Sequence, residues 1–289
     1  MQIYLEAFFE SCLGTLNWTW KSILFQVPWY SNYFWGLILI SLAVWSMEIL
    51  FPWRKEQSIV RKDFGLDVFY MFFNFFIFTI VISGFYKILE LVFGKWGITA
   101  GSLAFVDTSS LPIWTQLLIF FVLLDFVQWF THICLHRFPI LWRFHKIHHS
   151  VKEMGFAAHL RYHWMENILY KPLKTLGVML LGGFEPEQAY VVHFAAITIG
   201  HFNHANIKLT YGPLKYVFNN PVMHLYHHAY SLPKDAFGVN FGISLSLWDY
   251  LFGTHHIPED SGTIPLGFPS EETVPKTFWG QLIYGFKKK

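Results

Sequence analysis

Residues 113–136 read IWTQLLIFFVLLDFVQWFTHICLH, and this stretch decides the fold. From Ile113 to Thr131 it is long and apolar enough to cross a bilayer as a helix, which takes about 20 residues. It contains Asp125 and leads directly into an HxxxH pair, His132 and His136. The chain is therefore predicted to cross a membrane here and to present histidines where it leaves.

Two further segments are apolar over a similar length. One runs from Tyr33 to Phe51, before Pro52, and the other from about Val68 to Tyr86, with a possible extension to Phe93. Hydrophobic residues make up 54% of the 289-residue chain and charged residues 14%, against about 25% in soluble domains. The 32 Phe and 13 Trp residues exceed what a core of this size needs, which favours a lipid-facing surface.

The other apolar stretches are too polar or too short to span. Residues 1–30 mix aromatic and charged side chains, which favours an interfacial helix or a short hairpin. Residues 175–184 and 188–200 are separated by turn-forming residues, which favours a helical hairpin inserted partway into the membrane. The expected fold is an all-α integral membrane protein with about three spans, this hairpin and a helical histidine-cluster region.

A single membrane-embedded domain over residues 1–289 is expected, because the sequence holds no long linker or repeat. Its parts are an N-terminal interfacial segment with the first two spans (1–111), the third span with a di-metal catalytic region (112–256), and a C-terminal tail (257–289).

Basic residues predict the orientation. Eight basic residues follow the first or the third span: Arg54, Lys55, Arg61, Lys62, Arg137, Arg143, Lys146 and Lys152. The loop between the second and third spans has only Lys87 and Lys95. The positive-inside rule places the richer regions in the cytoplasm. All 15 histidines follow the third span, so the histidine clusters are expected on the cytoplasmic side.

Charge and cysteine content exclude several classes. A net charge of +2 without a basic run gives no reason to expect nucleic acid as a partner. The two cysteines, Cys12 and Cys134, exclude a disulfide framework and a CxxC site. Cys134 is expected to be a packing residue, because two helical steps turn it away from His132. No cleaved signal peptide is expected, since the N-terminus lacks a basic region before an apolar stretch.

Nine histidines are candidate ligands and come from four groups, the third of which is His201-Phe-Asn-His204. They are the HxxxH of His132 and His136, the HxxHH of His145, His148 and His149, the single His204, and a second HxxHH of His224, His227 and His228. On a helix, residues four apart point about 40° apart, and the middle histidine of HxxHH points about 60° to the other side. One metal ion can bind two histidines of a triplet, and a second ion beside it can bind the third. Nine ligands exceed the roughly six that one ion accepts, so two ions are expected. Imidazole suits iron, zinc, copper and nickel, so the metal stays open.

The other six histidines carry weaker signals. His201 could ligate or pack, because it lies one helical turn before a candidate ligand. The others are expected to play structural roles: His159 and His163 behind the ligands or at an interface, His193 packed or hydrogen-bonded, and His255 and His256 facing solvent.

Other functional classes fit less well. A zincin needs a glutamate after the first histidine, where Ile133 stands, and no GxSxG predicts a serine hydrolase. A metal-handling membrane protein or transporter should place polar ligands near the bilayer midplane on several spans. A metal-dependent hydrolase remains an alternative that oxygen-independent turnover would reveal.

The order of these motifs resembles the fatty acid hydroxylase/sterol desaturase superfamily of integral-membrane di-iron enzymes. The resemblance covers about residues 115–256 and extends beyond the histidine spacing. The further motifs are Asp125 before Trp129, His148-His149-Ser150, Arg161 before Glu166, His204-Ala-Asn206, Gly212-Pro213-Leu214, and Trp248-Asp249 with Phe252-Gly253-Thr254.

The resemblance implies an oxygen-activating centre of two iron ions, with zinc possible in the purified protein. Such a centre hydroxylates or desaturates a lipid: a sterol, fatty acyl chain, carotenoid, sphingoid base or ether lipid. Without a flavin, haem or Rossmann motif, electrons should come from an external donor of the ferredoxin or cytochrome b5 type. Asp125 and Glu166 are expected to accept hydrogen bonds from imidazoles, with a polar contact inside the bundle as the alternative for Asp125. Asp249 is expected to be a cap or turn residue.

Overall fold

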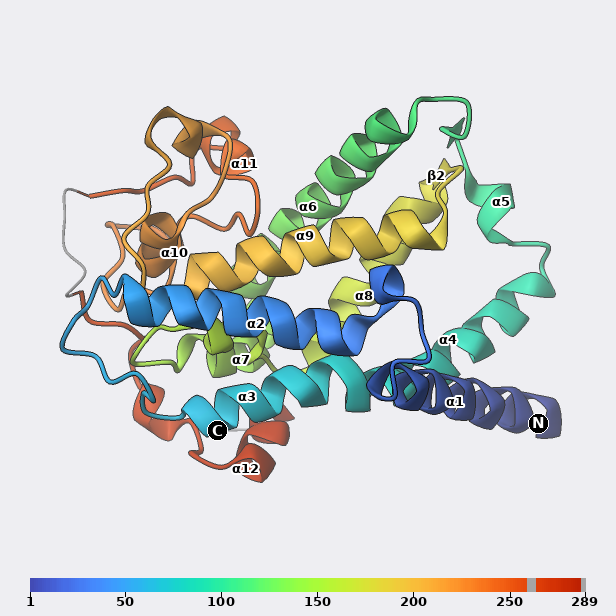
Figure 1. Cartoon of the computed structure of the whole chain (residues 1–289), viewed down its shortest axis with the longest axis horizontal. Helices are drawn as coiled ribbons and strands as arrows, with labels where there is room; N and C mark the ends of the chain where they lie inside the picture. The colour runs from blue at the N-terminus through green and yellow to red at the C-terminus, as the bar shows by residue number, and fades with distance from the viewer. Residues whose placement is uncertain (259–263, 287–289) are drawn as a thin grey trace.

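The structure is a computed structural model that describes residues 1–258 and 264–286 (Figure 1). Its regular structure is almost entirely helical. Within the described residues, the strands are the two-residue β1 (Val106–Asp107) and β2 (Leu181–Gly182), which pair in parallel. The predicted all-α class is confirmed.

Three helical segments are long and apolar enough to cross a membrane. They are α2 (Tyr33–Leu50), the continuous segment Phe64–Gly94, and α6 (Ile113–Arg137). Large apolar side chains such as Leu39 and Leu118 are exposed on them, as residues facing lipid would be. Each of the three predicted spans is present as a helix.

The second span contains a local change of helical geometry. It consists of α3 (Phe64–Phe72), the π-helical turn η2 (Phe73–Ile77) and α4 (Phe78–Gly94). In η2, Asn74 Nδ2 donates to the carbonyls of Leu160 at 3.1 Å and Tyr162 at 2.9 Å. Because π turns project a side chain out of the regular helical pattern, this one ties the span to a loop far along the chain.

Helix α6 continues past the predicted end of the third span at Thr131. It reaches Arg137, so His132 and His136 lie on the same helix as the apolar run. Pro139 then starts α7 (Pro139–His149), as prolines commonly do in the first helical turn. The helix therefore carries its own histidine pair out of the apolar segment.

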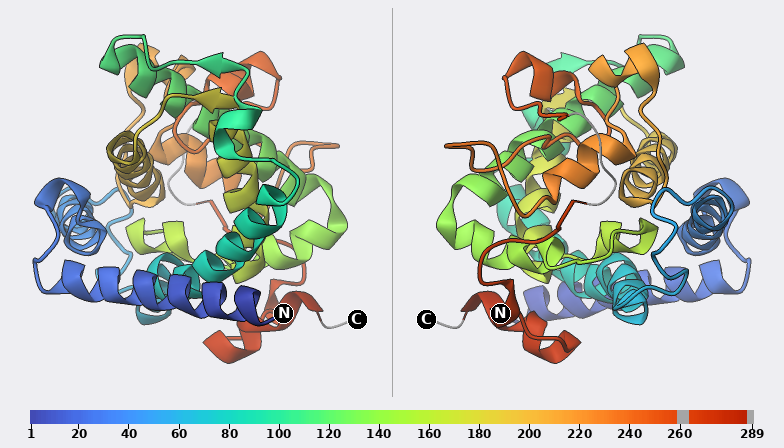
Figure 2. Two further views of the ribbon diagram at one scale, coloured as in Figure 1. Left: turned by 90° about the vertical axis from the view of Figure 1, so that its right-hand side faces the viewer. Right: turned by 90° about the vertical axis from the view of Figure 1, so that its left-hand side faces the viewer.

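The N-terminal segment forms one long helix, α1 (Gln2–Ile23), which packs along α4. Ser11 Oγ donates to the carbonyl of Ser83 at 3.0 Å. Gly84 allows the close approach, because a Cβ there would lie 2.5 Å from the ring of Phe8. The end-on views of Figure 2 show α1 along the outer edge of the helices.

The segment predicted as a hairpin contains two helices, α8 (Trp164–Leu180) and α9 (Pro186–His204), joined by a short turn. Gly183 lies in the turn between them with φ of +90°, a conformation that favours glycine. A Cβ at Gly183 would also lie 2.5 Å from the backbone nitrogen of Ser109. The turn is thus held against the segment that precedes α6.

The remaining elements are short and collect mainly at one end of the molecule (Figure 1). They are α5 (Ala100–Leu103), α10 (Pro221–His227), α11 (Leu247–Leu251), α12 (Phe278–Leu282) and the 3₁₀ turns η1 (Trp29–Ser31), η3 (Phe156–Leu160), η4 (Gly212–Tyr216), η5 (Glu271–Thr273) and η6 (Tyr284–Phe286). A core cluster that includes Leu37, Met71 and Ile197 joins α2, α3 and α9. This cluster fixes the long helices whose ends frame the histidines.

Candidate metal centre

Five histidines from three helices form a first group. They are His132 and His136 of α6, His145 and His149 of α7, and His227 of α10, and one ring nitrogen of each lies within 4.8 Å of the others. His136 is half-buried and the other four are buried. The fold therefore brings together residues far apart in sequence, since His132 and His227 are separated by 95 positions.

Four further histidines form a second group. They are His148 of α7, His204 at the end of α9, His224 of α10 and His228, which caps α10. All four are buried, and their candidate ligand nitrogens also lie within 4.8 Å of one another. The two groups together contain all nine histidines that the sequence singled out.

The two HxxHH triplets divide between the groups as helical spacing requires. In each triplet, the outer pair joins one group and the middle histidine joins the other. The outer pair of α7 belongs to the first group, whereas the outer pair of α10 belongs to the second. Since each of these helices serves both groups, the two groups are adjacent.

Backbone carbonyls orient four of the rings through Nδ1. The pairs are His132 with Phe241 (2.7 Å), His227 with Val239 (2.7 Å), His148 with Arg161 (3.0 Å) and His204 with Gly200 (2.7 Å). A carbonyl only accepts, so Nδ1 carries the proton and Nε2 keeps its lone pair. This tautomer leaves Nε2 free for a metal. Two of the carbonyls belong to residues 239–245, named here the acceptor loop.

Several of these lone pairs face each other. His132 Nε2 lies 3.1 Å from His145 Nε2, and His148 Nε2 lies 3.3 Å from His204 Nε2. His145 donates its Nδ1 proton to Glu166, at 2.9 Å. Two acceptors at such distances repel unless a cation neutralises them. Burial lowers the pKa of His148 to about 3, so a proton does not supply that charge near neutral pH.

Other ring nitrogens in both groups are buried without a hydrogen-bond partner. They are Nε2 of His136, His149, His227 and His228, and Nδ1 of His224 and His228. A buried polar atom left unpaired costs roughly 1–3 kcal/mol. Coordination to metal ions would satisfy one such nitrogen on each ring, so the donor set fits a metal in each group.

A family model for fatty acid hydroxylases matches residues 117–254, which contain both histidine groups. This segment belongs to the fatty acid hydroxylase family. The family resemblance inferred from the motifs is confirmed.

Relatives of this fatty acid hydroxylase segment act on lipids or aldehydes by name. An ornithine lipid hydroxylase of Rhizobium tropici is 30% identical over 178 residues, 62% of this chain and 52% of the relative. The alkylglycerol monooxygenase of Homo sapiens is 28% identical over 163 residues, 54% of this chain and 34% of the relative. A very-long-chain aldehyde decarbonylase of Arabidopsis thaliana is 25% identical over 142 residues, 45% of this chain and 21% of the relative. The alignments thus span about half or less of these relatives, and no solved structure matches the chain.

Within the fatty acid hydroxylase segment, Glu166 has the contact expected of it. Its Oε2 accepts from His145 Nδ1 at 2.9 Å, and its Oε1 accepts from the backbone nitrogen of His163 at 3.2 Å. Burial raises the pKa of Glu166 to about 8 and lowers that of His145 well below its usual range. The carboxylate fixes the orientation of the His145 ring from the first turn of α8.

Asp125 does not contact an imidazole in the described structure, so that prediction is wrong. Its carboxylate accepts from the backbone nitrogens of Ser244 at 3.0 Å and Leu245 at 3.1 Å, and from Trp248 Nε1 at 3.0 Å. A buried carboxylate needs donors, and the acceptor loop supplies two. Asp125 therefore makes a polar contact inside the bundle that holds the acceptor loop against α6.

Asp249 holds the other part of the acceptor loop. Its Oδ1 accepts from the Phe241 nitrogen at 2.9 Å and Trp129 Nε1 at 3.1 Å, and its Oδ2 accepts from the Gly242 nitrogen at 2.8 Å. It also accepts from Thr254 Oγ1 at 2.6 Å, which agrees with the expected turn. The expectation missed the larger role, since Phe241 is the residue whose carbonyl orients His132.

A buried ion cluster supports the second group, and it was not predicted from the sequence. Asp67 is fully buried and lies 2.5 Å from Arg61 Nη2 and 3.1 Å from Arg161 Nη1. Arg161 also donates to Ser150 Oγ at 3.1 Å, and its carbonyl is the partner of His148. Asp67 is the one acidic residue within the first turns of an apolar span, which was the available signal.

The other histidines lie outside both groups. His201 Nε2 is 3.1 Å from Ser41 Oγ, and its Nδ1 is 2.8 Å from His159 Nδ1. His201 is buried and His159 is half-buried. His163 Nδ1 accepts from the Met165 nitrogen and caps α8. His193 is exposed and stacks on Phe75, and His255 is exposed and stacks on Tyr250. His256 is half-buried, so it departs from the expected solvent exposure. Cys134 is free and half-buried.

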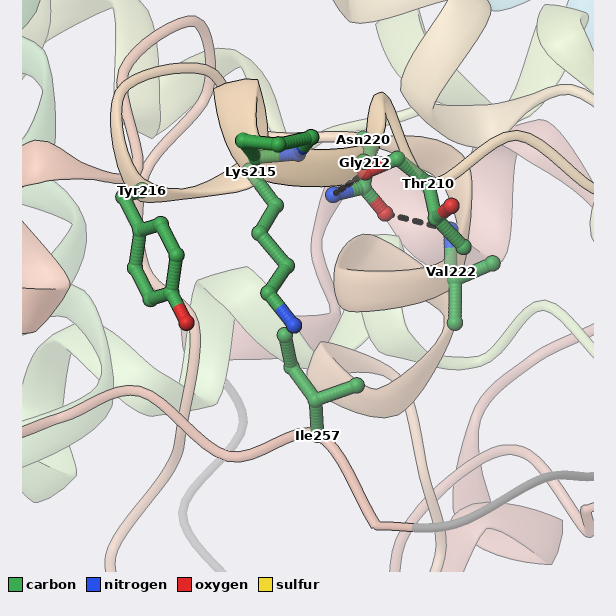
Figure 3. A pocket seen from close by; sticks show the side chains of 8 residues that line it. Thr210, Gly212, Lys215, Tyr216, Asn220, Val222 and Ile257 are labelled. Carbon is green, nitrogen blue, oxygen red and sulfur yellow. Dashed lines mark hydrogen bonds between the residues drawn. The ribbon is translucent and has the colours of Figure 1, made fainter.

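A pocket of about 380 Å³ lies beside α10 (Figure 3). Figure 3 shows Lys215 and Tyr216 along it, with Asn220 bonded to the start of α10. Asn220 Oδ1 accepts from the Val222 nitrogen at 3.1 Å. None of the lining residues is a histidine, so this pocket is distinct from the candidate metal centre.

Proposed function

We propose that this protein is a membrane-bound di-iron oxygenase that hydroxylates or desaturates a lipid with molecular oxygen. The observation that carries the proposal is the pairing of buried imidazole lone pairs in two adjacent groups, at 3.1 Å between His132 and His145 and 3.3 Å between His148 and His204. Nine histidines exceed the capacity of one ion, which supports two. All nine serve as ligands in this proposal.

Iron is favoured over zinc by the relatives rather than by the ligands. Imidazole binds both metals, but the relatives named hydroxylase and monooxygenase point to oxygen chemistry. Zinc could still occupy the purified protein. When bound, the irons would supply the activation of oxygen and the oxidation of an unactivated C–H bond.

The chain itself would orient the ligands and exclude water. The carbonyls of Phe241 and Val239 and the carboxylate of Glu166 fix three rings of the first group. The rings of Trp142 and Phe241 pack on His136, with centroids 4.9 and 5.1 Å away. An apolar wall of this kind keeps water from the reacting centre.

The three candidate spans support a lipid substrate drawn from the bilayer. We place the histidine groups on the cytoplasmic side, within a single membrane-embedded domain, because the basic residues cluster around them. Electrons would come from an external donor of the ferredoxin or cytochrome b5 type.

The proposal is tested with full-length protein purified in detergent without chelators. We expect about two iron ions per chain and reductant-dependent oxygen consumption that rises with added lipid. His148→Ala should abolish this consumption, whereas His255→Ala, which changes an exposed histidine, should not.

Each alternative predicts a different result. Zinc occupancy with turnover in the absence of oxygen would establish a metal-dependent hydrolase instead. Metal flux into liposomes, without oxygen consumption, would establish a transporter. One ion or none in a folded protein would refute the di-iron centre.

A further inference from the structure

A pocket of about 390 Å³ lies between α1, α4 and α8, apart from the histidines. This volume is within the range of ligand pockets, roughly 300–1,000 Å³. Hydroxyl side chains line it: Ser11 from α1, and Thr79, Ser83 and Tyr86 from α4. Because α4 is part of a candidate span, the pocket lies along a segment whose surroundings would be lipid. Polar groups at such a place mark a functional site by default.

Lys171 brings a positive charge into this pocket from α8. Its Nζ donates to Thr79 Oγ1 at 2.9 Å. Among the residues that the structure describes, no carboxylate forms an ion pair with it. Burial and the nearby charge of Lys174 lower the pKa of Lys171 to about 8. A half-buried ammonium that meets a like charge and no carboxylate would be stabilised by an anion.

The other charged residues of the pocket neutralise each other. Lys87 Nζ lies 3.1 and 3.0 Å from the two carboxylate oxygens of Glu90. The pocket therefore has an excess of one positive charge, and it is located at Lys171. An ammonium has three donors, of which Thr79 accepts one.

We propose that this pocket binds an anionic oxygen group, a phosphate or carboxylate, at Lys171. Tyr86 is a further donor, because its hydroxyl oxygen accepts from Thr175 and its own proton can point into the pocket. The anion belongs either to the headgroup of a lipid that enters from the bilayer or to a small soluble molecule. The site does not depend on the metal centre, so a result that refutes one of the two proposals does not refute the other.

Equilibrium binding to the full-length protein in detergent tests the proposal. The probes are phosphatidylglycerol, diacylglycerol with the same acyl chains, and inorganic phosphate. Charge-assisted hydrogen bonds favour phosphatidylglycerol over diacylglycerol by about tenfold. Lys171→Gln should lower the affinity for phosphatidylglycerol by about tenfold and remove its dependence on ionic strength. Inhibition of lipid binding by millimolar phosphate would support a soluble anion as a sufficient ligand, and lack of inhibition would support the lipid headgroup.

Matched variants separate charge from folding. Lys21→Gln removes an exposed lysine of α1 and should leave binding unchanged. Lys171→Arg keeps the charge and should retain most of the affinity, even if Lys171→Gln fails to fold. Equal affinity of wild-type protein for phosphatidylglycerol and diacylglycerol would overturn the proposal, as would full phosphatidylglycerol affinity in folded Lys171→Gln protein.

Discussion

The imidazole of His149 stacks on that of His228, with ring centroids 4.3 Å apart and planes inclined by 23°. His149 belongs to the first histidine group and His228 to the second. The two candidate metal sites thus share a wall made of two rings. A change at His149 should therefore affect both sites.

His149→Ala would remove a ligand from the first group and the packing surface of His228. Metal content should fall from about two ions per chain to about one or fewer, because each lost ligand weakens coordination. Elemental analysis of protein purified without chelators measures this. The buried control is His201→Ala, since His201 contacts Ser41 and His159 but belongs to neither group. Equal metal loss in both variants would contradict the assignment of ligands.

Glu166→Gln would keep the size of the side chain but replace the carboxyl group that orients His145. Loss of a partner behind a ligand typically lowers metal affinity about 10–100-fold. Competition with a chelator, followed by metal analysis, measures the change. Glu187→Gln replaces an exposed glutamate of α9 and should have no effect. Unchanged affinity in Glu166→Gln would show that the contact does not support the metal.

The parts of the site that follow helical spacing could be predicted from the sequence. The division of each HxxHH triplet between two groups depends only on angles along one helix, as in His145, His148 and His149. The spans could be predicted for a similar reason, because length and hydropathy are local. Helix α6 extends six residues beyond the apolar run that ends at Thr131, since a helix does not stop where its apolar run stops.

The supports of the site could not be predicted, because they join distant loops. Asp125 was expected to face an imidazole from its place seven residues before His132, but helical direction does not tell which segment lies opposite. The acceptor loop lies there, and its residue Ser244 is 119 positions away in sequence. The bond between Asp67 and Arg161 spans 94 positions and has no periodic pattern.

Asp249→Asn would weaken the acceptor loop without touching a ligand. An amide keeps one acceptor oxygen, so at least one of the bonds to the Phe241 and Gly242 nitrogens should be lost. We expect a loss of about 1–3 kcal/mol in the free energy of unfolding, and faster metal release. Thermal unfolding in detergent and the rate of metal loss to a chelator measure these effects. Asp235→Asn, at an exposed position, is the control. Slower metal release than in wild-type protein would contradict the role of the loop.

Acidification should destabilise the fold through the buried histidines. Seven of the nine lie outside the candidate spans, and burial lowers the pKa of each, with His148 at about 3. In the unfolded chain these rings titrate near 6.5, so below that pH the unfolded state binds more protons than the folded one. Stability should therefore fall as pH drops from 6.5, by up to about 1.4 kcal/mol per pH unit for each such histidine, until the folded-state pKa is reached.

Thermal unfolding between pH 7.5 and 5.5, in metal-free and metal-loaded protein, measures the slope. His148→Ala should reduce the slope. A melting temperature independent of pH in this window would show that the rings are not buried in neutral form.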